Sequence, residues 1–304
     1  MKTTHKRIKA ADRAATGILY AVAGFFLLLL AAFTLYILYK GALAFKPEYL
    51  SFTRSGIGIQ FFNTIYLVFL SLIISMPIGI AAGIFMAEYA GKGRLTHFLR
   101  TCIETLASLP SIVVGLFGYL VFLVMTGSHW NLIAGALAVS ILNIPSLTTV
   151  TEDALQGVPE RYREGSLALG ATHWQTIRKV LLPAALPRIV TGVIMAAGRG
   201  FGEAAALLYT SGMSSDVSFR NWNPLSPDSP LNPFRPADTL AVHIWALKTE
   251  GVDANAAALS DLSAAVLILL VFAFSLASRK IGEKLERRTT GEEPERRKKR
   301  WKQK

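Results

Sequence analysis

The chain has 304 residues, 52% of them hydrophobic, and a formal net charge of +12. Its apolar residues fall into long blocks that exceed the needs of one globular core, which excludes an ordinary soluble domain and indicates an all-α, polytopic membrane protein. The positive charge does not indicate nucleic-acid binding, because the cations flank the apolar blocks or crowd the carboxy terminus and are not interleaved with aromatic residues.

The first element is a basic segment followed by an apolar block. Residues 1–16 carry five Lys and Arg residues, and residues 17–39 carry no charge. A membrane helix needs about 20 apolar residues, whereas the apolar region of a secretory signal has about 7 to 15. We therefore expect residues 17–39 to form a first membrane helix that is retained.

Five further apolar blocks follow, at residues 60–87, 102–126, 131–150, 189–212 and 257–278. Six crossings place both termini on one side of the membrane. Of the 32 Lys and Arg residues, 25 flank the crossings on that side, six lie on the other side, and Arg199 lies inside a crossing. Because positive charge accumulates on the cytoplasmic side, both termini are expected in the cytoplasm.

The expected crossings and their orientation divide the chain into three parts. We expect a cytoplasmic amino terminus over residues 1–16, a six-helix domain over residues 17–278, and a basic cytoplasmic tail over residues 279–304. The tail is dense in charge and cannot bury a core, so we expect it to be disordered and to retain the topology.

Prolines and glycines punctuate the middle blocks. Pro77, Pro110 and Pro145 lie in the second, third and fourth blocks, and each is expected to kink its helix. Kinks serve packing in many proteins and broken helices in transporters, and the residues alone do not separate these uses. Gly79 and Gly83 form a GxxxG pair, which permits close helix approach but also occurs by chance.

Residues 164–183 (EGSLALGATHWQTIRKVLLP) are a polar insert between the fourth and fifth blocks. Gly170 suits a helix end that needs a left-handed residue. Thr172 and Gln175 have the spacing of a capping box, which starts a second helix. The pattern predicts a helix, a sharp turn and a second helix.

The second helix of this insert is expected to be amphipathic. Spacing places Trp174, Ile177 and Leu181 on one face, with Arg178 and Lys179 elsewhere on the cylinder. We expect this element to be too short to cross a membrane.

The insert resembles the EAA loop of ABC-transporter permeases. The likeness rests on Glu164, Gly170, Ile177 and the pair Leu182 and Pro183. In that family the loop is cytoplasmic and docks into a groove of the ATPase subunit. The resemblance therefore implies a coupling loop, over residues 151–188, to which Thr172 and Trp174 also belong.

The insert also departs from the family pattern. The family usually has two alanines after the glutamate, whereas this chain has Gly165 and Ser166. Glycine in a helix interior is less favourable than alanine by about 1 kcal/mol, which lowers the expected rigidity of the first helix. An amphipathic linker lying on the bilayer surface is the alternative interpretation.

Three longer stretches extend the resemblance. Residues 76–89 (MPIGIAAGIFMAEY), 109–118 (LPSIVVGLFG) and 185–210 (ALPRIVTGVIMAAGRGFGEAAALLYT) are similar to PstA, the second permease subunit of phosphate-specific ABC transporters. The likeness covers most of residues 60–278 and implies the MetI-like permease fold of binding-protein-dependent importers.

This resemblance implies an import function and a set of partners. The chain is expected to be a multi-pass permease of the bacterial inner membrane that imports phosphate. The implied partners are a homologous permease of the PstC type, a dimer of PstB-type ATPase subunits, a periplasmic phosphate-binding protein of the PstS type, and membrane lipid. No cofactor is implied.

Arg199 and Glu203 are the only charges between residues 189 and 210. Arg199 lies roughly 15 Å from either end of this block, near mid-bilayer. Because a central arginine in lipid costs about 2.5 to 3.5 kcal/mol, we expect it to face the bundle interior, an aqueous path or a partner. The four-residue spacing places Glu203 on the same helical face, where each charge partly neutralises the other.

Two roles suit this pair. A guanidinium offers paired donors to phosphate oxygens, which favours a place in the translocation path or its gate. The alternative is a structural ion pair that fixes helix register or contacts the partner permease.

Residues 213–240 hold five of the thirteen prolines, so we expect an extended, exposed external loop. The resemblance implies that it faces the binding protein, and a disordered spacer is the alternative. The following LAVHIWAL, residues 240–247, is too short to cross and is expected to be re-entrant or interfacial. His243 is expected to be a packed residue and not a ligand.

No catalytic or metal-binding motif occurs in the sequence. There is no GxxxxGK[ST] phosphate loop, no HExxH motif and no metal-spaced Cys or His cluster. The single cysteine, Cys102, is expected to be a buried structural residue. The chain is therefore expected not to be an enzyme, and ATP hydrolysis is assigned to a separate subunit.

Three other functions remain open at this point. The first is an ABC permease for another oxyanion or a phosphonate. The second is an ion-coupled secondary transporter that uses Arg199 and Glu203 as a relay. The third is a membrane assembly factor without transport activity.

Overall fold

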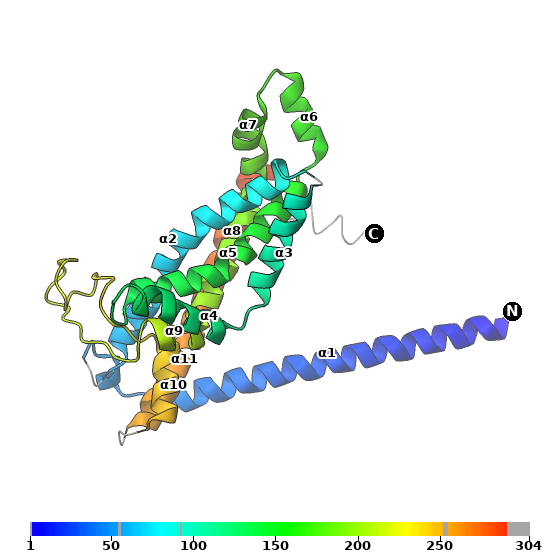
Figure 1. Ribbon diagram of the computed structural model, residues 1–304. Coiled ribbons are helices and arrows are strands. Elements are labelled where there is room, and N and C mark those ends of the chain that lie inside the picture. Colours follow the sequence, from blue (N-terminus) through cyan, green and yellow to red (C-terminus); the bar gives the residue numbers. More distant parts are fainter. Residues whose placement is uncertain (1, 54–55, 92, 252–254, 291–304) are drawn as a thin grey trace.

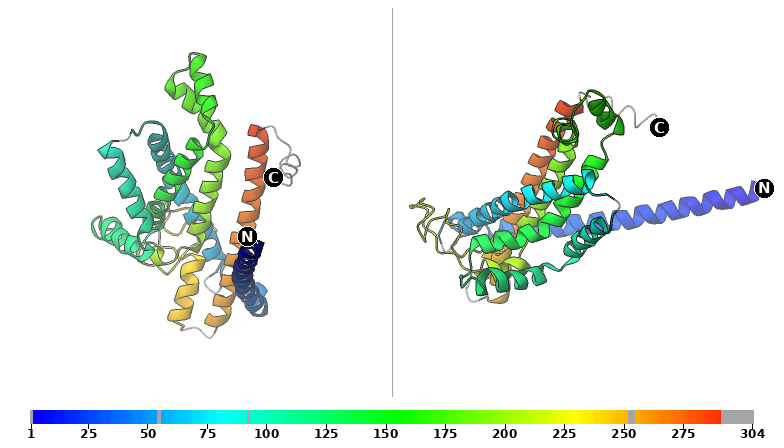
Figure 2. Two further views of the ribbon diagram at one scale, coloured as in Figure 1. Left: turned by 90° about the vertical axis from the view of Figure 1, so that its right-hand side faces the viewer. Right: turned by 45° about the horizontal axis from the view of Figure 1, so that its top comes forward.

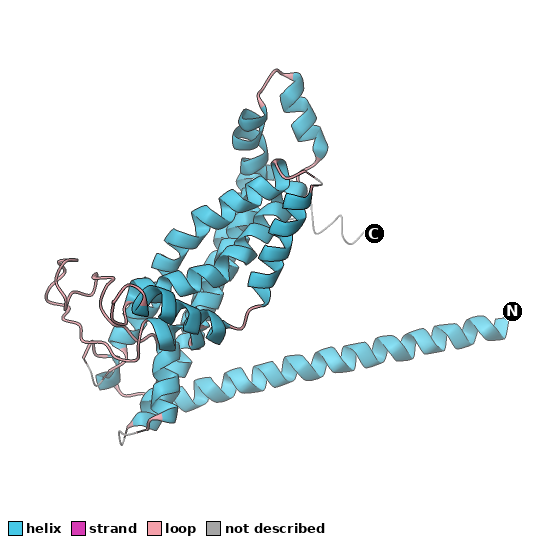
Figure 3. Ribbon diagram, viewed as in Figure 1, coloured by secondary structure: helices cyan, strands magenta, loops and turns pink. Residues whose placement is uncertain are grey.

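The computed structural model describes residues 2–53, 56–91, 93–251 and 255–290, and no strand occurs in these ranges (Figures 1 and 3). The helices are α1 (Lys2–Ala44), α2 (Gly58–Glu88), α3 (Arg94–Ser108), α4 (Ser111–Gly118), α5 (Leu132–Gln156), α6 (Glu160–Ala168), α7 (His173–Thr176), α8 (Leu182–Gly202), α9 (Ala205–Thr210), α10 (Leu240–Thr249) and α11 (Ala256–Thr290). A 3-10 turn covers Pro47–Leu50, and π-helical turns cover Tyr119–Val124 and Ile177–Leu181. The predicted all-α class is confirmed.

Five helices of the described chain are long and apolar enough to cross a membrane. They are Asp12–Ala44, Gly58–Glu88, Leu132–Gln156, His173–Gly202 and Ala256–Gly282. A sixth crossing is made only if a bent pair of helices counts as one.

That bent pair corrects the third predicted crossing, which was expected as one kinked helix over residues 102–126. Helices 94–108 and 111–124 meet at 99°. Leu109, the residue before Pro110, has an extended backbone, because a proline disfavours helical geometry in the residue before it. In contrast, α2 and α5 continue without a break through Pro77 and Pro145.

The fifth crossing also differs from the expected block at residues 189–212. The helix starts in the polar insert at His173, passes through the π turn into α8, and ends at Gly202. Glu203 is extended, and α9 is a separate short helix. The second helix of the insert is therefore the start of a crossing and not a separate short element.

The centre of the bundle is the close pairing of α2 with α5. A β-carbon added at Gly79 would lie 2.6 Å from that of Leu147, and one added at Gly83 would lie 2.5 Å from that of Thr151. Only glycine allows the two backbones to approach this closely. The GxxxG pair is thus a real packing contact and not a chance pattern.

Helix α1 stands apart from the rest of the bundle and contacts α11 near its own carboxyl end (Figures 1 and 2). A side chain at Gly41 would collide with Ala265 of α11, so this is a tight crossing. The most apolar part of α1 buries nothing within the chain.

Two expectations about the surface need correction. Cys102 is half-exposed and not buried, because it lies on α3, which has no buried residue. The tail was expected to be disordered from residue 279, but α11 continues to Thr290, since residues 283–290 contain no glycine or proline to stop it. Residues 291–304 of the tail lie outside the described residues.

Candidate functional site: the α6–α7 hairpin and the membrane arginine

Helices α6 and α7 form a hairpin that projects beyond the ends of α2 and α5 (Figure 1). After α6, Gly170 has φ +82°, its N–H donates to the Leu167 carbonyl (2.9 Å), and the Ala171 N–H donates to Ser166 (3.3 Å). This pair of bonds is a Schellman motif. The predicted left-handed helix end at Gly170 is confirmed.

The predicted start of the second helix is confirmed as well. The Thr172 hydroxyl accepts from the Gln175 N–H (3.3 Å), and the Gln175 side chain accepts from the Thr172 N–H (3.0 Å). Each residue therefore satisfies a backbone donor that the helix leaves unpaired.

The predicted apolar face of this helix is only partly packed. Ile177 and Leu181 are fully buried against Leu155 and Ala185, whereas Trp174 is 54% exposed. The prediction concerned only the shared face; Trp174 is left exposed because α7 extends past the helices that cover Ile177 and Leu181 (Figure 1).

The hairpin presents apolar groups at its exposed end. Leu169 at the turn is 90% exposed, and Leu167, Trp174 and Tyr162 are also exposed. Of the other residues predicted to belong to the coupling loop, Glu164 and Pro183 are exposed and Leu182 is half-buried. Such a rigid, apolar protrusion with charged neighbours is suited to insertion into a groove of another protein.

Two contacts that the sequence analysis did not find attach the hairpin to the bundle. Arg163 of α6 and His173 of α7 both contact the carboxylate of Glu88, the last residue of α2. The hydrogen bond to Glu88 raises the pKa of the Arg163 guanidinium above its ordinary value, so the arginine stays charged. The one available signal was a carboxylate at the end of a long apolar block.

The structure separates Arg199 from Glu203, contrary to the prediction that they share a helical face. Arg199 donates to the Leu142 carbonyl of α5 (3.3 Å), whereas the Glu203 carboxylate accepts from the Ala206 N–H (3.1 Å). Because α8 ends at Gly202, Glu203 caps the start of α9 and the four-residue helical relation is lost.

Arg199 nevertheless lies near the middle of the bundle, measured along the helix axes. Its acceptor, Leu142, is the eleventh of the 25 residues of α5, roughly 15 Å from one end and 21 Å from the other. The Arg199 side chain is exposed on the surface of this single chain. A charge at this depth needs an aqueous or protein neighbour, which the chain alone does not supply.

The proline-rich loop at residues 213–239 lies at the other end of the bundle from the hairpin (Figure 1). It contains no helix, as predicted, but it is not simply extended and exposed. Arg235 is only 3% exposed, and its guanidinium donates to Asn63 of α2 (2.7 Å) and to the carbonyls of Ser229 (3.1 Å) and Pro230 (3.0 Å).

Burial lowers the pKa of Arg235 to about 10, which still leaves it protonated at neutral pH. The unfolded arginine has a higher, ordinary pKa, so the unfolded chain binds more protons than the folded chain only from about pH 10 up to that ordinary pKa. The contribution of this group to stability therefore rises with pH in that window and is constant near neutrality.

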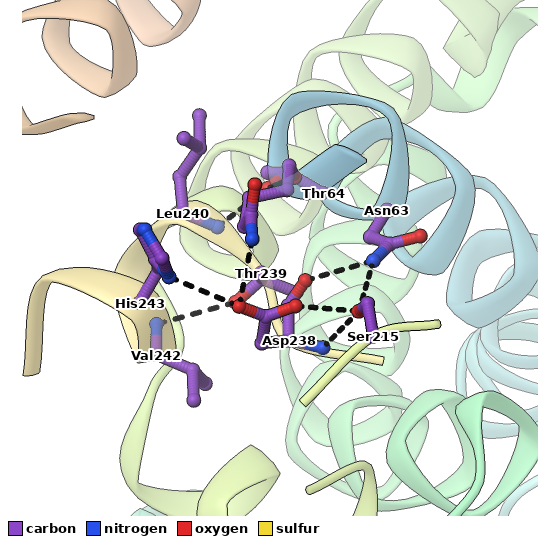
Figure 4. Close-up of polar contacts among 9 residues, drawn as sticks. Asn63, Thr64, Ser215, Asp238, Thr239, Leu240, Val242 and His243 are labelled. Carbon is purple, nitrogen blue, oxygen red and sulfur yellow. Dashed lines mark hydrogen bonds and ion pairs between the residues drawn. The ribbon is translucent and has the colours of Figure 1, made fainter. Parts of the chain in front are cut away.

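The buried carboxylate of Asp238 also joins the loop to α2 and α10 (Figure 4). Asp238 accepts from Ser215 (2.5 Å), Gln60 (3.1 Å) and His243 Nδ1 (3.1 Å). His243 was expected to be a packed residue, and its packing includes this hydrogen bond on the short helix α10. Among the described residues, no group of three or more His, Cys, Asp or Glu side chains gathers as metal ligands.

Residues 79–291 match a family described as binding-protein-dependent transport system inner membrane component. The probable ABC transporter permease protein YqgI of Bacillus subtilis (strain 168) is 44% identical over 289 residues, which cover 93% of this chain and 98% of the relative.

Relatives named for phosphate match a smaller part of the chain. The phosphate transport system permease protein PstA of Xylella fastidiosa (strain 9a5c) is 37% identical over 158 residues, 52% of this chain and 55% of the relative. This match spans about half the length of both proteins.

Solved structures share the fold at low identity. A chain of the bacterial alginate ABC transporter in complex with alginate pentasaccharide-bound periplasmic protein aligns over 90% of this chain and 97% of its own, with a TM-score of 0.62 and 18% identity. A chain of the MetNI methionine ABC transporter, in an inward-facing conformation, aligns over 73% and 93%, with a TM-score of 0.56 and 20% identity.

Proposed function

Because the chain belongs to the family of inner membrane components of binding-protein-dependent transport systems, we propose that it is the permease subunit of an ATP-driven importer for inorganic phosphate. The observation that carries the phosphate assignment is the 37% identity to a phosphate transport system permease over half the chain. No enzymatic activity is assigned to this subunit.

The hairpin of α6 and α7 is the proposed contact with the ATPase subunits. Its apolar end, at Leu169 and Trp174, projects beyond the bundle, which is the shape that a groove on another protein accepts (Figure 1). The helix that begins at His173 continues without a break to Gly202. A displacement of the hairpin is therefore carried along one rigid helix toward Arg199.

Arg199 is the proposed polar element of the translocation path or its gate. It is exposed on the single chain near the middle of α5, and within the described part of the chain its guanidinium makes one hydrogen bond, to the Leu142 carbonyl. Its remaining donors are therefore available to an anion or to a partner subunit. Glu203 caps α9 in this conformation and belongs to the gate only if α8 and α9 rearrange.

The proposed assembly follows the family likeness. A homologous permease of the PstC type, two PstB-type ATPase subunits and a PstS-type phosphate-binding protein complete it, with the hairpin on the cytoplasmic side and residues 213–239 outside. The unequal distribution of Lys and Arg supports this orientation.

A permease for another oxyanion or a phosphonate is the second candidate. It is favoured by one observation: the relative that matches along its whole length is named as a probable ABC permease with no substrate in its name.

The deciding experiment is co-purification through a carboxy-terminal tag, identification of the partners, and reconstitution of the complex into liposomes. We expect ATP-driven phosphate uptake that unlabelled phosphate inhibits more strongly than sulfate or phosphonate. Stronger inhibition by another anion would assign that substrate instead. Uptake by the chain alone under an ion gradient, without ATPase, would support a secondary transporter and contradict the proposal.

A further inference from the structure

The carboxylate of Glu88 is the meeting point of three helices at the cytoplasmic end of the bundle. Its side chain is only 1% exposed. Arg163 Nη1 and Nη2 lie 2.5 and 2.9 Å from its two oxygens, and His173 Nε2 lies 3.3 Å from Oε2. One buried carboxylate at the end of α2 therefore holds both α6 and α7.

The contact with Arg163 has the geometry of a strong ion pair. Two parallel N–H···O bonds join the guanidinium to both carboxylate oxygens, which fixes direction as well as distance. Arg163 Nε also contacts Glu160 of its own helix (3.1 Å), so the guanidinium is held between two carboxylates. The Arg163 side chain is 25% exposed and that of Glu88 is 1% exposed, so most of the ion pair is shielded from water.

Helix α6 has little else to fix its position on the bundle. None of its residues is buried, in contrast to the π-helical turn that follows α7, where Ile177 and Leu181 are buried completely. Within the hairpin, the Ser166 and Thr176 hydroxyls lie 2.9 Å apart and join α6 to α7. The two arms are thus joined to each other, and α6 is joined to α2 through Glu88.

His173 adds a second contact from the other arm. Its ring lies edge-on to the Tyr89 ring, with centroids 5.2 Å apart, while its Nε2 faces Glu88. The first residue of α7 is therefore placed against the last residues of α2 by one polar and one aromatic contact.

We propose that Glu88 is the positioning residue of the hairpin: it fixes Arg163 and His173 to α2, so that a displacement of the hairpin moves α2 as well as α8. This inference rests on the proposed docking of the hairpin to an ATPase. Helix α2 is packed on α5 through Gly79 and Gly83, so the movement reaches the centre of the bundle by a second route.

The first test measures the position of the hairpin in the full chain without any partner. Spin labels are placed at Leu169 on the turn and at exposed Asp153 on α5, in a Cys102→Ser background, and their separation is measured by pulsed EPR in liposomes. We expect one narrow distance in the parent chain. Glu88→Gln and Arg163→Gln are each expected to broaden it, because each removes the paired bonds.

The matched control is Arg100→Gln, which breaks a different ion pair at the same end of the bundle, between Arg100 and Glu152 (2.6 Å). This variant should keep the narrow distance. The exchange of charges in Glu88→Arg with Arg163→Glu should restore it, because the pair is re-formed in reverse. An unchanged distance in both single variants would overturn the proposal, and Arg163→Gln decides it if Glu88→Gln does not insert.

The second test measures transport in the reconstituted complex. We expect phosphate uptake per ATP hydrolysed to fall about tenfold in Glu88→Gln and Arg163→Gln, with the ATPase subunits still bound, and to recover in the charge exchange. Normal uptake per ATP in both single variants would overturn the transmission through α2. If the parent chain binds no ATPase, the proposed function is contradicted. If the variants still show the expected EPR changes in that case, the positioning role of Glu88 stands.

Discussion

Gly170 is the residue whose backbone alone defines the turn of the hairpin. Its φ of +82° lies in the left-handed region, where a residue with a side chain is less stable by about 1 to 2 kcal/mol. We expect Gly170→Ala to lower amide hydrogen-exchange protection at residues 170 and 171 by about tenfold, because the Schellman bonds loosen.

Gly165 provides the matched control in the same hairpin. It lies inside α6, and a β-carbon there would meet nothing within 4 Å. Gly165→Ala should therefore raise protection of α6, since alanine is favoured in a helix by about 1 kcal/mol. Equal effects of the two substitutions would contradict the role assigned to the Gly170 backbone.

Arg199 is a charged residue of a helix that is long and apolar enough to cross the membrane. Its charge lies beside the middle of α5, yet its side chain is exposed and has a single hydrogen bond. We expect Arg199→Ala to assemble normally and to lose phosphate uptake by about tenfold or more, which corresponds to about 1.4 kcal/mol. Uptake by the reconstituted complex is the measurement.

Arg199→Lys separates charge from geometry. Lysine keeps the charge but lacks the planar fork, so an intermediate rate is expected if the guanidinium contacts the anion directly. Uptake by Arg199→Ala at the parent rate would remove Arg199 from the path.

At the scale of elements, the loop at residues 213–239 and the start of α5 depend on each other. The N–H of Leu132 donates to the Arg235 carbonyl (3.0 Å) and the N–H of Ile133 to the Pro233 carbonyl (2.8 Å). Asn131 caps the same helix by accepting from the Ala134 N–H (2.8 Å). The loop thus satisfies donors that every helix leaves unpaired in its first turn.

The side chain of Arg235 holds this loop in place. We expect Arg235→Gln to destabilise the loop by about 3 kcal/mol, because several buried acceptors lose their donor. Limited proteolysis of residues 213–239 in the purified chain measures the change. The control is Arg220→Gln in the same loop, where the side chain is exposed and a change within about 0.5 kcal/mol is expected. Equal proteolysis rates in the two variants would show that Arg235 is not the anchor.

At the scale of the whole molecule, the hairpin and the loop at residues 213–239 lie at opposite ends of the bundle (Figure 1). The unequal distribution of Lys and Arg predicts that the hairpin is cytoplasmic and the loop external. We expect a cysteine at Leu169 to react with a membrane-impermeant maleimide only after cells are permeabilised, and one at Leu225 to react in intact cells. Both positions are highly exposed, so access decides the result.

A Cys102→Ser background removes the native thiol from this assay. Labelling of Leu169→Cys in intact cells would place the hairpin outside and would end the coupling proposal. The Leu225→Cys variant shows in the same cells that the reagent reaches an external site.

Features that depend on neighbouring residues were predictable from the sequence. The apolar blocks, the capping box at Thr172 and the left-handed Gly170 are local, because each is defined by residues a few positions apart. The close approach at Gly79 and Gly83 was predicted in kind, although its partner helix was not.

Features that depend on distant residues needed the fold. Glu88 and Arg163 are 75 positions apart, and Asn63 and Arg235 are 172 apart, so no local pattern joins them. The end of α8 at Gly202 was missed because the carboxylate of Glu203 caps α9, where the sequence showed only a four-residue spacing to Arg199.

The sequence by itself determined the membrane class, four of the apolar crossings and the turn of the hairpin, because hydrophobicity and backbone conformation act over a few residues. It missed the break in the third crossing and the bounds of the fifth. Tertiary structure alone decided which charges meet, since an ion pair inside a bundle forms between whichever helices packing brings together. For this protein that decision separates Arg199 from Glu203 and joins Glu88 to both arms of the hairpin.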